Sequence, residues 1–281
     1  MATVTGGSAA PTATSWPRQA LTFTRLTVRS QLKNRRTLLF VLGFPIALYL
    51  LESRMFIPQS GPGAATGRTV LAIAFGIFGA FSAALVGFAR QLSDDVTSRR
   101  YRKFRSLPIS PSADFTGRFL GGYVVAVVAE AVVLAIAFFD GGAFDAVGPL
   151  SVVVVLGSLF AFCLIAMCVA TFVAILLAGD SVPQVSSFLM MIVFFVTGFD
   201  GMSVSLLPAD LRAVVNYVPN SLAARFQMGY VVGHPVTASG PSIPLPDGAG
   251  YAALLVVYTV LGAAVAAFLF GRFVYAGEVG E

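Results

Sequence analysis

Few residues in this chain could carry out chemistry, and their types and spacing argue against an enzyme. His234 is the only histidine, which excludes histidine-rich metal sites. It is also the one, weak, candidate for the histidine of a serine–histidine triad. Cys163 and Cys168 lie five residues apart on one expected helix and point in different directions, so neither a disulfide nor a metal site is expected. Neither Lys33 nor Lys103 follows a glycine, as the lysine of a phosphate-binding P-loop must. We therefore expect no catalytic site, no metal, no cofactor and no ATPase site.

One ionisable residue, Glu130, falls near the centre of a long apolar run. A charge at that depth is costly, so the carboxyl group should face a cavity, pair with a polar group or stay protonated. Two interpretations follow. Glu130 contacts a substrate or a transported proton, or it is a structural carboxyl group that is hydrogen-bonded within a helix bundle.

A strongly basic segment lies between the second and third apolar runs. Its order of charges is typical of a short helix, because Ser93 can cap the start while Asp94 and Asp95 occupy the first turn, where the helix dipole favours anions. Pro108 and Pro111 would end it.

This segment offers two kinds of contact to a partner. Thr97, Tyr101 and Phe104, spaced by four and three residues, would share one edge of the helix. Around them lies a dense group of cations: Arg99, Arg100, Arg102, Lys103 and Arg105. In the alternative interpretation the segment is a solvated loop that only fixes the topology.

Six long apolar runs must position these residues, and a membrane-spanning helix needs about 20 such residues. The runs are Thr37 to Leu51, Thr69 to Ala89, Phe119 to Phe139, Leu150 to Ala178, Val182 to Phe199 and Tyr251 to Tyr275. Hydrophobic residues make up 57% of the chain and charged residues only 11%, against about 25% charged residues in a soluble domain. The runs are continuously apolar, whereas the strands of a transmembrane barrel alternate apolar and polar residues. We expect an all-α polytopic membrane protein with six transmembrane helices.

Around these helices the sequence predicts several smaller parts. Residues 1–17 form a disordered tail, and residues 18–36 form a helix along the membrane surface, with Arg18, Arg25, Arg29 and Arg36 on one stripe. This helix is either a simple positive-inside anchor or a dedicated element that docks on a partner. The transmembrane domain covers 37–275, with a loop at 91–111, an outer segment at 200–249 and a final tail at 276–281.

The outer segment should contain a short amphipathic helix between Pro208 and Pro219, with Leu211, Val214, Val215 and Val218 on its apolar side. Small residues at spacings of four predict close helix contacts, within or between subunits. They are Gly79, Ala83 and Gly87 in the second run and Ala263, Ala267 and Gly271 in the last.

The basic residues are distributed unevenly, and this predicts the orientation. Fourteen of the 18 flank the N-terminal side of the first run, the loop after the second run and the end of the last run. Because basic residues are retained in the cytoplasm, both termini should be cytoplasmic. This asymmetry accounts for the net charge of +5, so no nucleic acid partner is implied.

Nearly the whole chain resembles the type-2 membrane subunits of ATP-binding-cassette (ABC) exporters, the drug and polysaccharide exporter permeases. The resemblance rests on the surface helix before six runs and on the charged segment that ends in Leu107-Pro108-Ile109-Ser110. It also rests on the outer segment, from Gly198-Phe199-Asp200-Gly201 to Val218-Pro219-Asn220. This chain lacks the family's Phe-Pro after the glycine, and its final turn is Pro-Asn rather than Asn-Pro, so the boundaries of any re-entrant hairpin are blurred.

The resemblance implies that Asp94 to Phe104 is a coupling helix, which docks in a cleft of a separate ATPase subunit. It implies two copies of that ATPase, a second permease subunit, identical or related, and a place in the cytoplasmic membrane. A competing class is a proton-coupled secondary transporter with Glu130 as its coupling carboxylate, for which inverted repeats would be expected. A membrane enzyme would need clustered polar residues at one face, where only scattered ones such as Asp200 and Asp210 occur.

Overall fold

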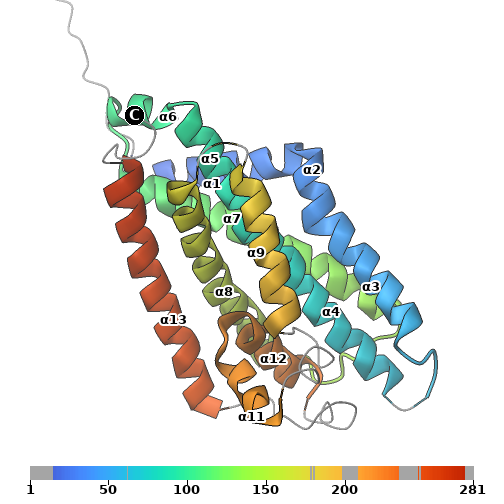
Figure 1. Ribbon diagram of the computed structural model, residues 1–281. Helices are drawn as coiled ribbons and strands as arrows, with labels where there is room; N and C mark the ends of the chain where they lie inside the picture. The colour runs from blue at the N-terminus through green and yellow to red at the C-terminus, as the bar shows by residue number, and fades with distance from the viewer. Residues whose placement is uncertain are drawn as a thin grey trace, which may run out of the picture.

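The chain folds into a bundle of long helices that run side by side between two ends (Figure 1). The computed structural model describes residues 15–61, 63–177, 179, 181–197, 208–233, 246 and 248–275, and no strand occurs among them. The prediction of an all-α, multi-pass membrane protein is confirmed. The expected tails, the Gly198 to Gly201 motif and His234 lie outside the described residues, apart from residues 15–17.

Five described helical segments are long and apolar enough to cross a membrane. The first, Arg35–Met55, consists of α2 (Arg35–Leu38), η1 (Leu39–Gly43) and α3 (Phe44–Met55), and the second, Ala64–Thr97, consists of α4 (Ala64–Phe81), η2 (Ser82–Gly87) and α5 (Phe88–Thr97). The next two are the single helices α7 (Pro111–Phe139) and α8 (Pro149–Leu176). The last, Gly248–Tyr275, consists of α13 (Gly248–Leu269) and η5 (Phe270–Tyr275). The segments η1, η2 and η5 are π-helical. A sixth helix, α9 (Ser181–Thr197), has 17 residues, at the short end of the range of about 17–25 for a span.

The second span is longer than the sequence predicted. It was expected to end at Ala89, but the helix continues to Thr97 and reaches 34 residues, which is about 51 Å. The hydrocarbon core is only about 30 Å thick, so part of this helix must extend beyond it. The chain has no proline between Gly63 and Pro108, and Leu92 and Asp95 are buried against the bundle. Tertiary packing therefore carries the helix past the apolar run.

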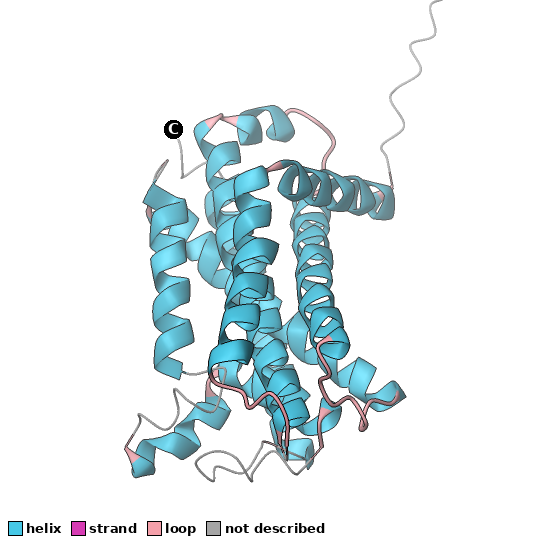
Figure 2. Ribbon diagram, turned by 90° about the vertical axis from the view of Figure 1, so that its right-hand side faces the viewer, coloured by secondary structure: helices cyan, strands magenta, loops and turns pink. Residues whose placement is uncertain are grey.

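A helix at the start of the described chain, α1 (Trp16–Lys33), lies across the ends of the spans (Figure 2). It packs on α7, where a Cβ atom at Gly117 would overlap the carbonyl oxygen of Ala20. The predicted surface helix is therefore present, with bounds two to three residues earlier than expected. Asn34 then turns the chain, because its side chain accepts hydrogen bonds from the N–H groups of Arg36 and Thr37 and so caps α2.

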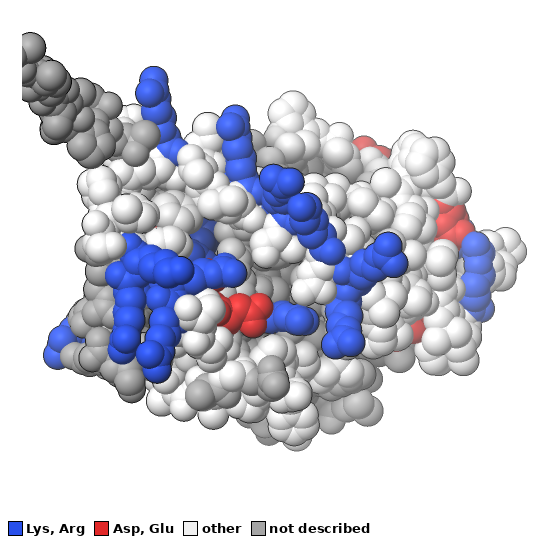
Figure 3. All heavy atoms as spheres, turned by 90° about the horizontal axis from the view of Figure 1, so that it is seen from above, with Lys and Arg blue, Asp and Glu red and all other residues white. Residues whose placement is uncertain are grey.

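We call the end of the bundle that carries α1, α6 (Arg100–Arg105) and η5 the basic end. Lys and Arg side chains gather on this face, seen from above in Figure 3. The opposite end carries α11 (Ala209–Arg212), the 3₁₀ helix η3 (Ala213–Tyr217) and α12 (Pro219–Val231).

The predicted outer helix is thus split into α11 and η3, with Val215 buried and Leu211 and Val214 exposed. The helix α12 was not predicted. Its Asn220 and Gln227 are buried, and Gln227 donates a hydrogen bond to Ser158 of α8. Because these buried positions are polar, the sequence of α12 contains no apolar run that would predict a buried helix.

Of the two predicted sets of small residues, the first is confirmed as a close contact within the chain. A Cβ atom at Gly79 would lie 2.7 Å from the carbonyl oxygen of Val41, and one at Gly87 would lie 3.2 Å from the side chain of Gln31. In the second set Ala267 and Gly271 are exposed, and a Cβ atom at Gly271 would meet nothing within 4 Å. These residues remain available for a contact between subunits.

Candidate coupling site at the basic end

The predicted single helix from Asp94 to Phe104 is wrong, because two helices share this stretch. Ser93 lies inside α5 and donates its hydroxyl to the carbonyl of Gly179 at 3.2 Å, so it does not cap a helix start. Arg99 adopts a left-handed conformation with φ of 55°, which breaks the helix before α6 begins. The break turns α6 over the end of the bundle, while Pro111 begins α7.

A buried group of charges lies beneath α6, and we call it the Arg118 cluster. Arg118 donates to Asp95 of α5 at 2.5 Å and to Asp114, one turn earlier on α7, at 2.6 Å. Tyr275 of η5 donates its hydroxyl to the other oxygen of Asp114 at 2.9 Å. The cluster, completed by Arg100, which donates to Asp95 at 2.5 Å, joins three spans and α6.

Aromatic rings enclose the central guanidinium. Its carbon lies 5.7 Å from the ring centre of Tyr101 and 5.8 Å from that of Phe23 on α1. Tyr101 also packs edge-on against Phe270 and Tyr275, and only 4% of it is exposed. This burial raises the pKa of Tyr101 well above its usual range, so the phenol stays neutral.

The charges of the cluster balance. Arg118 and both carboxylates are almost fully buried, with side-chain exposures of 4%, 3% and 0%, whereas Arg100 is 60% exposed. A buried ion pair gains little over apolar packing, but removal of one partner leaves an uncompensated charge at a cost of about 3–5 kcal/mol. The cluster therefore fixes how α5, α6, α7 and η5 meet.

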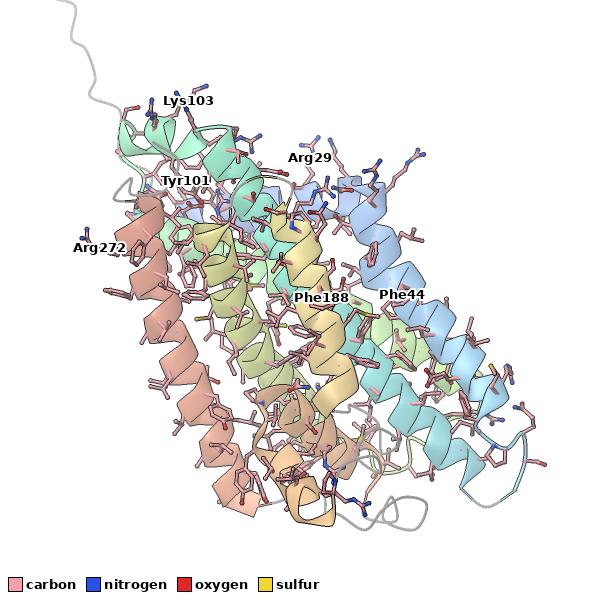
Figure 4. The ribbon with its side chains drawn as sticks, viewed as in Figure 1. Arg29, Phe44, Tyr101, Lys103, Phe188 and Arg272 are labelled. Carbon is pink, nitrogen blue, oxygen red and sulfur yellow. The ribbon has the colours of Figure 1, made fainter. Side chains whose placement is uncertain are left out.

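The residues predicted for coupling separate into two groups. Asp95 and Tyr101 are buried in the chain's own cluster, and Phe104 is partly buried against Phe23, so these aromatic side chains do not form the exposed edge that was expected. The exposed members, which a partner could reach, are Asp94, Arg99, Arg100, Arg102 and Lys103. In Figure 4 Lys103 projects away from the bundle and Tyr101 points toward it. Arg105 belongs to α6, but its side chain lies outside the description.

Asp114, Arg118 and Tyr275 belong to this site but were not predicted to do so from the sequence. Arg118 was counted only as a basic residue that orients the chain. The available signal was the spacing of Asp114 and Arg118 by four residues at the start of a span, which places opposite charges on one face of a helix.

Glu130 lies deep in the bundle, as predicted, at 1% exposure. It contacts α4 closely, since a Cβ atom at Gly76 would lie 2.9 Å from its Cγ, and the thiol of Cys163 on α8 and the amide of Gln227 on α12 lie near its carboxyl group. Neither carboxyl oxygen makes a well-aligned hydrogen bond to a described residue, although the side chain of Gln227 lies close enough to interact with the carboxyl group. Both interpretations of Glu130 therefore remain predictions: a contact for a substrate or proton, or a structural carboxyl group beside Gln227.

The described residues contain no group of three or more His, Cys, Asp or Glu side chains that could hold a metal ion. No family model matches the chain, and no curated protein is detectably similar to it in sequence. Fold and geometry define an all-α, multi-pass membrane protein with a buried ion cluster beneath a short basic helix.

The Arg118 cluster makes a stability prediction. Arg118→Met should lower the free energy of unfolding by about 3–5 kcal/mol, because it leaves the buried Asp114 without its cation and Asp95 with only the exposed Arg100. Arg100→Met removes a bond to the same Asp95 but from an exposed side chain, and should cost less than about 1 kcal/mol. Denaturation in a mild detergent measures both, and equal losses would show that Arg118 is not the centre of the cluster.

Proposed function

We propose that this chain is the permease subunit of an ABC exporter, in which transport is driven by ATP hydrolysis on a separate subunit. The observation that carries the proposal is the pairing of an exposed cationic helix, α6, with a buried cluster directly beneath it. Exposed arginine and lysine side chains suit recognition by an acidic cleft. The buried cluster suits the transmission of a displacement, because its bonds join α6 to three spans.

In this proposal the basic end faces the cytoplasm, in agreement with the retention of basic residues on that side. The chain would lie in the cytoplasmic membrane with both termini inside. Two ATPase copies would bind under two permease subunits, identical or related, since one set of six helices supplies half of a path in the family that the sequence resembles. The exposed Ala267 and Gly271 of the last span would suit the contact between the subunits.

A test of the proposal reverses the charges of α6. Arg99, Arg102 and Lys103 changed together to Glu should abolish copurification of an ATPase in mild detergent, because the three exposed cations would then repel an acidic cleft. Arg35→Glu with Arg36→Glu, exposed residues of the same basic end but of α2, are the control and should leave copurification intact.

The purified chain alone should hydrolyse no ATP, and raised salt should weaken the complex with the parent chain. The proposal fails if no ATPase copurifies with the parent, or if the α6 and α2 variants retain it equally.

The second candidate is a proton-coupled secondary transporter, and it is favoured by the deep burial of Glu130, which pairs with no cation among the described residues. An ionisable side chain in the interior of a membrane-spanning bundle is a natural stopping point for a proton. In this candidate Glu130 would be the coupling carboxylate, and no ATPase would be needed.

This candidate predicts that vesicles containing the purified chain take up protons when a membrane potential is imposed, as reported by an enclosed pH-sensitive dye. Glu130→Gln should abolish the uptake, since it keeps the size of the side chain but cannot titrate. Asp145→Asn, at an exposed carboxyl group, is the control and should retain it. If uptake is the same in all three proteins, Glu130 carries no proton. A structural Glu130 would tolerate Gln while Glu130→Leu destabilises the bundle.

A further inference from the structure

A groove runs between the surface helix α1 and the span α7, and neither proposed function uses it. It has a volume of about 420 Å³ and is lined by Thr24, Arg25, Val28, Arg29, Leu32, Lys33 and Val124. This volume falls within the range of about 300–1,000 Å³ that is usual for ligand sites. Its wall is apolar along Val28, Leu32 and Val124, while three cations stand on α1.

The cations of the groove lack a counter-charge in the described part of the chain. Arg25, Arg29 and Lys33 are exposed and spaced by four residues, so they repel one another along one face of α1. The helix contains no acidic residue, and no ion pair joins it to another element among the described residues. Arg29 projects from the basic end in Figure 4. An anion from outside the chain would relieve this repulsion.

The apolar wall leads toward a face of α7 that no described part of the chain covers. Val124 is 43% exposed, and Leu120 and Val128, one turn to either side, are 37% and 46% exposed. In a membrane-spanning helix an exposed apolar stripe suits contact with the hydrocarbon chains of the bilayer. The groove therefore joins a cationic surface to a surface that contacts acyl chains, along an element that lies across the ends of the spans.

We propose that this groove binds one anionic phospholipid, with its phosphate on Arg25, Arg29 and Lys33 and an acyl chain along Val28, Leu32 and Val124. The charge of the headgroup and the apolar length of the chain match the two parts of the groove. Basic residues at a membrane surface attract anionic lipids, and each contributes to the affinity independently. The site is independent of the transport mechanism, because it involves neither α6 nor Glu130.

The probes are phosphatidylglycerol and phosphatidylcholine, offered to the full chain in mixed vesicles. After extraction and washing in detergent, mass spectrometry counts the lipid molecules that each chain retains. The parent should retain phosphatidylglycerol in preference to phosphatidylcholine. Arg25→Gln with Arg29→Gln and Lys33→Gln should weaken retention on the order of 100-fold. Arg35→Gln with Arg36→Gln, also exposed on the basic end but outside the groove, should change it far less.

The apolar half is tested separately. Val124→Trp fills the groove from an exposed position and should displace the lipid, whereas Val128→Trp, one turn further along the same stripe, should not. Equal retention by these two variants would overturn the proposal. Equal retention of both lipids would also overturn it, as would an equal loss of lipid in the triple variant at 25, 29 and 33 and the double variant at 35 and 36. Complete displacement of the lipid by millimolar inorganic phosphate would show that the site binds anions in general and would overturn the proposal too. If the parent chain is a dimer without bound lipid and Val124→Trp converts it to a monomer, the groove binds a second copy of the chain and the proposal is wrong.

Discussion

Arg118 lies between Asp95 and Asp114 where all three side chains are almost fully withdrawn from solvent. Charges in such a position tolerate little displacement, because both carboxylates share this guanidinium and Asp114 has no other cation paired with it among the described residues. Asp95 belongs to the end of the second span and Asp114 to the start of the third, while Tyr275 adds the end of the last. The short connection through α6 is therefore attached to the spans at both of its ends. At the other end of the bundle Asp140, next to Arg54, Arg68 and Tyr49, ties the first three spans together in a similar way.

This arrangement divides the basic residues by role. Arg118, beneath α6, stabilises the chain itself, Arg100 is exposed but also pairs with Asp95, and Arg102, Lys103 and the cations of α1 are exposed to partners. The buried group must be kept for the exposed group to hold its position, so a change in Tyr101 or Arg118 would alter folding and partner binding together. Only the exposed cations can be changed to probe a partner alone. The same reasoning separates the lipid groove from α6, because different surface residues line it.

The spans could be predicted because their length and continuous apolar character need no knowledge of tertiary contacts, and Glu130 was found for the same reason. The break at Arg99 could not be predicted, since an arginine in a left-handed conformation has no signal in the sequence, and the residues that are buried on either side of it, Asp95 and Tyr101, find their contacts only in the folded bundle. The pairing of Asp95 with Arg118 could not be predicted either, because Arg118 lies 23 residues away on another helix. Ser93 had the right residue type for a cap, but burial of Leu92 and Asp95 extends α5 through it. The polar face of α12 finds its partners only after the bundle has formed.

The central claim is that the Arg118 cluster holds α6 against the end of the last span. It is tested most directly by the distance between spin labels at Lys103 and Gly271, both exposed, after Cys163 and Cys168 have been replaced by alanine. Pulsed electron paramagnetic resonance should give a narrow distribution of distances in this parent. Arg118→Met should broaden the distribution, while Arg102→Met, at an exposed side chain of α6 outside the cluster, should leave it nearly unchanged. A distribution that is equally narrow with and without Arg118 would contradict the claim.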